Sequence, residues 1–172
     1  MNLFLLRHGI AVERGTPGYA SDTLRPLTPK GRRQLRETAG AWRKMELEFD
    51  LILTSSLRRA KETASVLAEE LEWKHRPQVL TELSPGRNPA AVVQKILARQ
   101  PAPANLLLVG HEPHLSRLIS LLVSGASTTG AGDTGFALKK GGLAKLEIEH
   151  LQPQKCATLA WLLTPKQLRW MV

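Results

Sequence analysis

Short apolar runs alternate with stretches of helical periodicity over the first two thirds of the chain. Residues 2–6, 50–54 and 105–109 are almost wholly apolar, which is typical of strands buried on both faces. Apolar residues at helical spacing follow each run, over residues 29–46, 57–71 and 113–122, and again over 89–97. This alternation predicts an α/β fold: a three-layer sandwich with a mostly parallel sheet and helices on both faces.

Helix-start signals support this interpretation. Thr28-Pro29 and Asn88-Pro89 each combine a capping side chain with a proline at the first helical position. Ser55-Ser56 is expected to cap the helix of residues 57–71, and Pro113 is expected to begin the helix that extends to residue 122.

The last third of the chain has a different pattern. A Gly/Thr/Ser loop over residues 124–135 precedes two β-like segments, 136–140 and 143–148, which are separated by Gly141-Gly142 and predict a hairpin. Residues 156–163 predict a final strand, and Thr164-Pro165 predicts a short helix. No composition shift suggests a boundary, so residues 1–172 are expected to form one domain.

Composition adds a positive charge to this picture. The 172 residues include 24 Lys and Arg against 15 Asp and Glu, which gives a net charge of +9 and indicates affinity for anions of any class. The lone cysteine, Cys156, excludes an internal disulfide and is expected to be a small buried apolar residue. No apolar run is long enough for a membrane span, and a soluble, cytoplasmic setting is expected.

Candidate chemistry lies directly after the three buried strands. The strand ends deliver Arg7-His8-Gly9, the segment from Ser55 to Ala60 with Arg58 and Arg59, and Gly110-His111-Glu112. Because parallel strands end at one edge of a sheet, two imidazoles and two or three guanidiniums should converge there. Guanidiniums bind phosphate oxygens and a neutral imidazole can attack phosphorus, so this combination predicts phosphoryl transfer that needs no metal.

Three sequence blocks resemble the signature blocks of the histidine phosphatase superfamily. They are Leu6-Arg7-His8-Gly9, the segment from Thr54 to Ala64, and Val109-Gly110-His111-Glu112-Pro113. The resemblance implies a phosphoglycerate-mutase-like fold without a cofactor, in which His8 is the nucleophile, Arg7 and Arg59 bind the phosphate, and His111 is the second pocket histidine. Arg59 is preferred to Arg58 because the arginine of that block directly precedes Ala.

Within the superfamily, the chain most resembles the small phosphohistidine phosphatases. The chain is short, its opening motif reads Arg7-His8-Gly9-Ile10-Ala11, and residues 22–31 resemble the matching segment of that group, which would bring Arg25 to the pocket rim. The resemblance implies hydrolysis of phosphohistidine on a partner protein, a signalling domain, with a covalent phospho-His8 intermediate.

Two alternative functions stay open at this stage. An ester leaving group needs a proton from the enzyme, whereas the imidazole of phosphohistidine departs with little help. If Glu82 is a general acid, the chain is instead a phosphatase of small phosphomonoesters; if Glu82 is a loop carboxylate, phosphohistidine is favoured. A protein of another class, an inactive phosphoprotein-binding module, is disfavoured by the complete set of site residues.

Three further sequence features do not fit the functions they would otherwise suggest. The glycines of residues 130–135 match a dinucleotide fingerprint but follow a loop rather than a strand, and His111-Glu112-Pro113-His114 has the wrong spacing for zinc. His114 is expected in a first helical turn or at the surface, and His75 and His150 in solvent. Scattered basic residues with few aromatics argue against specific nucleic-acid binding.

Overall fold

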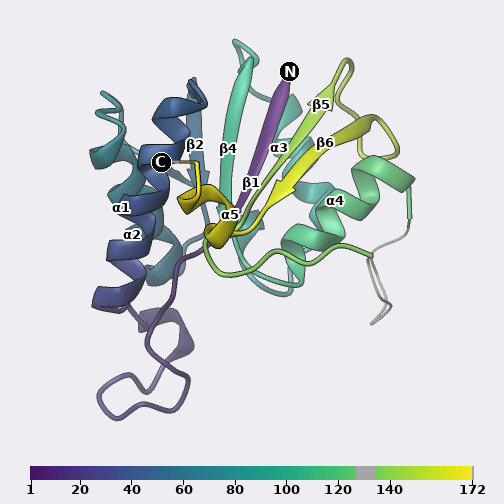
Figure 1. Cartoon of the computed structure of the whole chain (residues 1–172). Helices are drawn as coiled ribbons and strands as arrows, with labels where there is room; N and C mark the ends of the chain where they lie inside the picture. The colour runs from purple at the N-terminus through teal and green to yellow at the C-terminus, as the bar shows by residue number, and fades with distance from the viewer. Residues whose placement is uncertain (127–134, 172) are drawn as a thin grey trace.

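The computed structural model describes residues 1–126 and 135–171 and contains a six-stranded sheet between two layers of helices (Figure 1). The strands are β1 (Asn2–Arg7), β2 (Leu51–Thr54), β3 (Gln78–Val79), β4 (Asn105–Gly110), β5 (Leu143–Ile148) and β6 (Ala157–Leu163). The α-helices are α1 (Pro29–Lys44), α2 (Arg58–Glu70), α3 (Pro89–Leu97), α4 (His114–Ser124) and α5 (Pro165–Arg169), and two 3-10 turns are η1 (Asp22–Leu24) and η2 (Thr81–Leu83).

The sheet order is β3-β2-β4-β1-β5-β6. The first four strands in this order are parallel, whereas β5 pairs antiparallel with both β1 and β6. The mostly parallel three-layer α/β prediction is therefore confirmed. The carboxyl ends of β1, β2 and β4 lie at one edge, from which the loop of residues 12–27 extends, as the purple trace below the sheet in Figure 1 shows.

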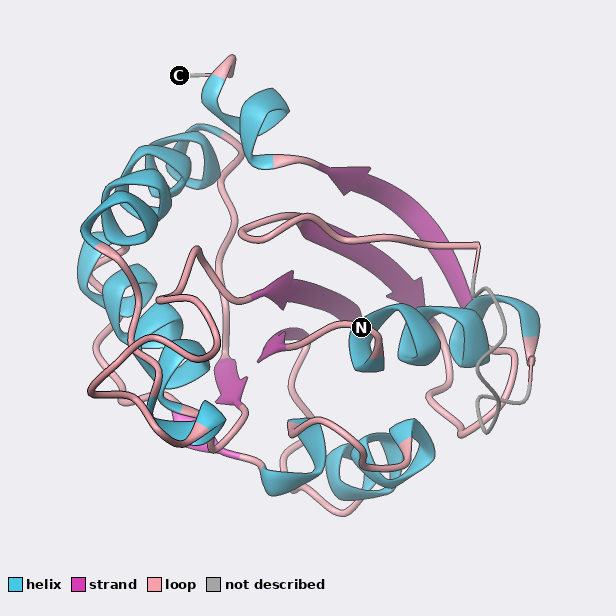
Figure 2. Ribbon diagram, turned by 90° about the horizontal axis from the view of Figure 1, so that it is seen from below, coloured by secondary structure: helices cyan, strands magenta, loops and turns pink. Residues whose placement is uncertain are grey.

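Each central strand contributes side chains to the apolar clusters on both faces of the sheet. In β1, Leu3 and Leu5 join one apolar cluster, and Phe4 and Leu6 join the other, because successive side chains of a strand point to opposite faces. The first cluster packs beneath α3 and α4, and the second beneath α1, α2 and α5, on the two sides of the sheet in Figure 2. Replacing a buried leucine of β1 by alanine is expected to cost about 2–5 kcal/mol.

The helix-start predictions hold for α1, α3 and α5, and α4 begins directly after Pro113, but neither Ser55 nor Ser56 is the N-cap residue of α2. Thr28, Asn88 and Thr164 cap α1, α3 and α5 with their side chains. The residue before α2, Leu57, has no capping side chain; the hydroxyl of Ser55 accepts from the amide of Leu57 at 3.3 Å and also contacts Nε2 of His111.

Two predictions in the last third of the chain are wrong. Residues 136–140 form no strand, and β5 pairs with β1 and β6, so the expected hairpin does not exist. Cys156 is half-buried against the cluster beneath α3 and α4 rather than fully buried. The glycine motif of residues 130–135 lies almost wholly outside the described residues. No helix of the described residues is long and apolar enough to cross a membrane.

Candidate active site

A cavity of about 230 Å³ opens where β1, β2 and β4 end. His8 and His111 line it with their ring centroids 5.0 Å apart, together with Arg7 and Arg59. The structure therefore brings together the four residues on which the sequence prediction depends. The other lining residues are Ala11, Arg14, Asp22, Arg25, Pro85, Glu112 and Lys140.

His8 is held in one tautomer. Its Nδ1 lies 2.7 Å from the carbonyl oxygen of Gly9, which can only accept, so Nδ1 carries the proton. Its Nε2 lies 3.2 Å from Nε of Arg59, which can only donate, so Nε2 is unprotonated and accepts from Arg59. Burial, opposed by the Gly9 contact and reinforced by the charges of Arg59 and Arg7, lowers the pKa of His8 to about 3. His8 is thus a neutral imidazole with its nucleophilic nitrogen at Nε2.

A buried threonine joins the nucleophile's loop to α2. The hydroxyl of Thr63 accepts a hydrogen bond from the amide of Gly9 at 3.0 Å and donates to the carbonyl of Arg59 at 2.7 Å. A Cβ on Gly9 would lie 2.9 Å from a methyl carbon of the buried Leu35, so a larger residue there would require Leu35 to shift. These contacts fix His8 relative to Arg59.

His111 contacts the residue that follows β2. Its Nε2 lies 2.9 Å from the hydroxyl of Ser55, while its Nδ1 is buried and has no hydrogen-bond partner among the described residues. Burial, with the nearby charges of His8 and Arg59, lowers the pKa of His111 to about 2. His111 is therefore neutral and can hydrogen-bond a bound oxyanion without adding charge.

The two arginines are held differently. Arg7 donates from Nη1 to the carbonyl of Leu138 at 2.8 Å, and its buried Nε has no partner in the described part of the chain. Arg59 is 4% exposed and donates from Nη1 to the carbonyl of Asp22 at 2.8 Å and from Nη2 to its carboxylate at 3.0 Å. Both guanidiniums can offer forked hydrogen bonds to phosphate oxygens.

Asp22 is a pocket carboxylate that the sequence analysis did not select. Its Oδ1 accepts from Nε and Nη2 of Arg25 at 2.9 and 2.6 Å and lies 3.3 Å from Arg14, while Oδ2 accepts from Arg59. Burial raises the pKa of Asp22, but the hydrogen bond from Arg25 and the charge of Arg59 outweigh it and lower that pKa to about 2. The only signal for Asp22 is its place at the start of the 22–31 segment.

The remaining candidates fall inside and outside the cavity. Arg25 lines it, as expected, and also donates from Nη1 to the carbonyl of Val12 at 2.6 Å. Glu82 does not line it: its carboxylate lies 3.2 Å from the hydroxyl of Thr81 and 3.8 Å from Lys95. Arg58 points away and pairs with Glu62 at 2.8 Å. The structure does not bring Glu82 to the site.

The other pocket carboxylate, Glu112, is engaged in holding the cavity wall. Its Oε1 accepts from the amide of Leu138 at 3.1 Å and its Oε2 from the hydroxyl of Ser116 at 2.5 Å. Among the described residues, no group of three His, Cys, Asp or Glu side chains could hold a metal ion. The positive charge of the site comes from its arginines and Lys140.

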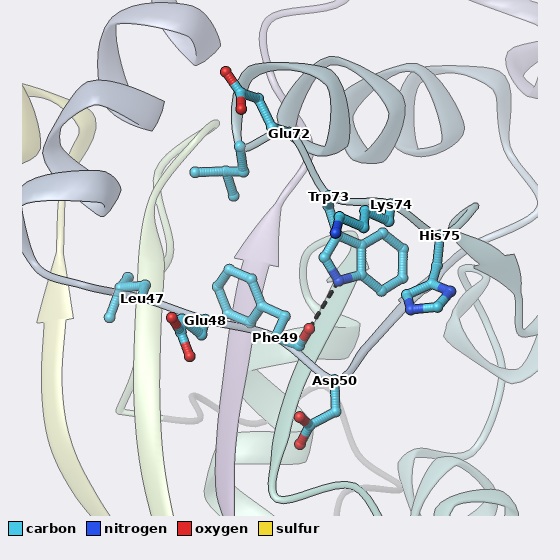
Figure 3. Close-up of a pocket in the computed structure, with 9 residues that line it drawn as sticks. Leu47, Glu48, Phe49, Asp50, Glu72, Trp73, Lys74 and His75 are labelled. Carbon is cyan, nitrogen blue, oxygen red and sulfur yellow. Dashed lines mark hydrogen bonds between the residues drawn. The ribbon is translucent and has the colours of Figure 1, made fainter.

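A larger cavity of about 510 Å³ lies at the opposite edge of the sheet, before β2 (Figure 3). Phe49 and Trp73 form part of its wall, and the indole nitrogen of Trp73 donates to the carbonyl of Phe49 at 2.8 Å. It contains no arginine among its lining residues and none of the strand-end residues. The smaller cavity is therefore the candidate active site, because it is the one lined by the two histidines and the arginines.

Comparison with known proteins identifies the family. The model of the histidine phosphatase superfamily (branch 1) matches residues 3–88, which include His8 and Arg59. An uncharacterized protein of Picosynechococcus sp. is 36% identical over 98% of this chain and 99% of its own length. The chain belongs to the histidine phosphatase superfamily. The cavity lined by His8, His111, Arg7 and Arg59 is thus the candidate active site of a histidine phosphatase.

Two further likenesses place this histidine phosphatase near one group. The phosphohistidine phosphatase SixA of Escherichia coli is 29% identical over 73% of this chain and 76% of its own length. The structure of the protein histidine phosphatase SixA complexed with tungstate has a TM-score of 0.81 and 25% identity, and the match covers 98% of this chain and 99% of that one. The predicted resemblance and fold are confirmed, and membership supports phosphatase activity.

Proposed function

We propose that this histidine phosphatase hydrolyses phosphohistidine on a partner protein through a covalent phospho-His8 intermediate. The observation that carries the proposal is the combination of a neutral His8, whose unprotonated Nε2 is the nucleophile, with a described lining in which both carboxylates, Asp22 and Glu112, already accept hydrogen bonds. Similarity to SixA, which is named as a phosphohistidine phosphatase, supports the same substrate class.

The carboxylates of the cavity are poorly suited to general acid catalysis. Asp22 is ionised at neutral pH, because its pKa is about 2, and Glu112 already accepts two hydrogen bonds. A general acid must carry a proton at the working pH and reach the leaving atom, and Glu82 lies outside the cavity. The phosphomonoesterase alternative with Glu82 as acid therefore lacks geometric support.

The first step transfers the phosphoryl group to His8. Nε2 of His8 attacks phosphorus while Arg7 and Arg59 bind the equatorial oxygens, and the phosphorus–nitrogen bond of the substrate breaks. The bonding electrons leave with the substrate's imidazole, which departs neutral because its other nitrogen already carries a proton. The second nitrogen of His8, Nδ1, keeps its proton through the hydrogen bond to Gly9.

Water completes the cycle. It attacks the phosphorus of phospho-His8, the phosphorus–Nε2 bond breaks, and dihydrogen phosphate leaves with both protons of the water. His8 returns to the neutral tautomer from which it began. The two guanidiniums supply the positive charge that Mg²⁺ supplies in many other phosphoryl-transfer enzymes, so we expect activity to be independent of metal.

The test compares substrates in the presence of EDTA. Phosphate release is measured from a phosphohistidine-bearing protein domain, p-nitrophenyl phosphate and sugar phosphates, with His8→Ala as control. Hydrolysis of phosphohistidine at a rate far above that of the esters, with an acid-labile, base-stable phosphoenzyme absent from His8→Ala, is the expected result. Preference for the esters, or activity that requires added Mg²⁺ or Zn²⁺, would overturn the proposal; silence on every substrate would favour the binding module.

A further inference from the structure

A second, more open cavity of about 660 Å³ adjoins the candidate active site. Lys140 lines both cavities, so the two lie side by side at the carboxyl edge of the sheet. We call this cavity the basic groove, because every charged side chain that lines it is a cation. These side chains are Lys139, Lys140, Lys166 and Arg169.

Backbone geometry places the groove beside the site. Gly141 has a φ of 78°, and its amide donates to the carbonyl of Arg7 at 2.9 Å, which turns residues 139–140 toward the end of β1. A Cβ on Gly141 would lie 3.3 Å from the ring of Pro165, so the same turn contacts the start of α5. The lysines of the turn and the cations of α5 therefore face one groove.

The cations of the groove are only partly neutralised. Arg169 lies 3.7 Å from Glu37, and Lys166 lies 4.9 Å from the ring centroid of Trp170. Lys139 and Lys140 are exposed, and no ion pair of the described residues includes either. Ile10 and Pro165 add apolar surface to the lining. Such a groove fits an extended segment that combines carboxylates with apolar side chains.

We propose that the basic groove binds an acidic segment flanking the phosphohistidine of the partner protein. This proposal rests on the proposed function for the identity of the reacting group. The active-site cavity, at about 230 Å³, has room for the phosphorylated side chain and little else, so the remainder of a protein substrate must lie on the rim. The groove is a rim surface that combines positive charge, apolar lining and a residue, Lys140, shared with the site.

The test uses synthetic peptides in which one phosphohistidine is flanked by four Glu, four Gln or four Lys. We expect kcat/KM for the Glu peptide to exceed that for the Gln peptide about tenfold at low salt, since each exposed charge pair contributes a few tenths of a kcal/mol. The double variant Lys139→Glu with Lys166→Glu should abolish this preference. The loss should appear as a higher KM for the Glu peptide, while the Gln peptide reacts at nearly its original rate.

A control variant separates docking from general attraction. Lys44→Glu with Lys155→Glu changes the net charge by the same amount, and both residues are exposed at the opposite edge of the sheet. It should retain the preference for the Glu peptide. Equal loss in both double variants would show steering by net charge and overturn the groove.

A binding measurement keeps the test independent of catalysis. Fluorescence anisotropy of unphosphorylated, labelled Glu and Gln peptides should give tighter binding of the Glu peptide, lost in the groove variant. If no phosphopeptide is hydrolysed but the Glu peptide still binds more tightly than the Gln peptide, the proposed function is wrong and the proposal that the groove binds acidic segments is retained. Equal binding of the two peptides, or tighter binding of a single-stranded oligonucleotide of the same charge, overturns the groove proposal.

Discussion

At the residue scale, Asp22 is an anion inside the candidate active site that pairs with the phosphate-binding candidate Arg59. Its carboxylate and carbonyl take both terminal nitrogens of Arg59, while Nε of Arg59 donates to the nucleophilic Nε2 of His8. A phosphoryl group that binds the N–H groups of Arg59 facing Asp22 competes with this residue, and Nε2 must lose its contact with Arg59 before it attacks.

Replacing Asp22 by Asn tests this competition. The change removes the negative charge and keeps the shape, and hydrogen bonds to charged acceptors are about 1 kcal/mol stronger than neutral ones, so inorganic phosphate should bind about fivefold more tightly. Isothermal titration calorimetry with phosphate measures the effect. The matched control is Glu48→Gln, an exposed carboxylate at the opposite edge, which should change nothing. Weaker binding by Asp22→Asn would mean that Asp22 holds Arg59 in its working position.

Thr63 offers a second test at a single side chain. Thr63→Val keeps the volume but leaves the amide of Gly9 without its partner and removes a bond to the carbonyl of Arg59, so the free energy of unfolding should fall by about 1–3 kcal/mol and kcat should fall with it. Urea denaturation and steady-state kinetics measure the two effects. Thr38→Val, which removes only a bond to Leu35 within α1, should lower stability without lowering kcat; equal kinetic losses in both variants would argue against a positioning role for Thr63.

At the element scale, α1 and α2 end in the same unusual way. Glu46 and Glu72 follow these helices with φ angles of 53° and 51°, a left-handed conformation that normally favours glycine. The next residue in each case, Leu47 or Trp73, closes the turn by donating to a carbonyl five residues back. Both glutamates also place negative charge at the negative end of a helix dipole.

Glu46→Gly and Glu72→Gly should therefore stabilise the protein. Relief of the left-handed strain exceeds the added entropy of an unfolded glycine, for an expected gain of about 0.5–1 kcal/mol at each position, measured as a shift in the urea midpoint. The same change at Glu69, which is exposed within α2, should instead destabilise by up to about 1 kcal/mol. A loss at Glu46 and Glu72 comparable to that at Glu69 would contradict this account.

The elements show what the sequence pattern could predict. Local signals such as Thr28-Pro29 and the apolar run of β1 were sufficient, because capping and burial are decided within a few residues. The false hairpin at Gly141-Gly142 arose because alternation does not specify the partner strand. The two glycines bring the chain against the end of β1, where the amide of Arg7 donates to the carbonyl of Gly142.

The site residues next to strand ends could be predicted from the sequence, whereas those in long loops could not. His8, Arg59 and His111 follow strands whose ends meet, so topology alone brings them together. Asp22 reaches the cavity from the long loop between β1 and α1, whose path no periodicity describes. Glu82 was an open alternative for the same reason, since a few residues of loop decide whether a carboxylate enters the cavity or pairs with Lys95.

At the scale of the whole molecule, three buried neutral histidines couple folding to pH. Burial lowers the pKa values of His8, His111 and His114 to about 3, 2 and 4, against an ordinary value of 6.5. The unfolded chain therefore binds more protons than the folded chain as pH falls below 6.5. Each histidine contributes stability that is complete above that pH and decreases by about 1.4 kcal/mol per pH unit below it.

His114 allows this coupling to be measured without altering the site. It lies in the first turn of α4, as the sequence suggests, but is 3% exposed rather than at the surface, and neither ring nitrogen has a hydrogen-bond partner among the described residues. Burial, reinforced by the charge of Arg117, keeps its pKa low. His114→Leu removes one protonation from the unfolded state and one unsatisfied ring from the core.

The variant should therefore gain stability relative to the wild-type protein as the solution is acidified. Between pH 7.5 and 5 the unfolded histidine takes up its proton and the folded one does not, so the difference in unfolding free energy should move in favour of His114→Leu by about 2 kcal/mol. Urea titrations at the two pH values measure it. The matched control is His75→Leu at an exposed residue, and a change of the same size there would argue against burial of His114 as the cause. A pH-independent result for His114→Leu would mean that the folded ring takes up its proton over the same pH range as the unfolded one, and its burial would then require an acceptor that pairs with the charge.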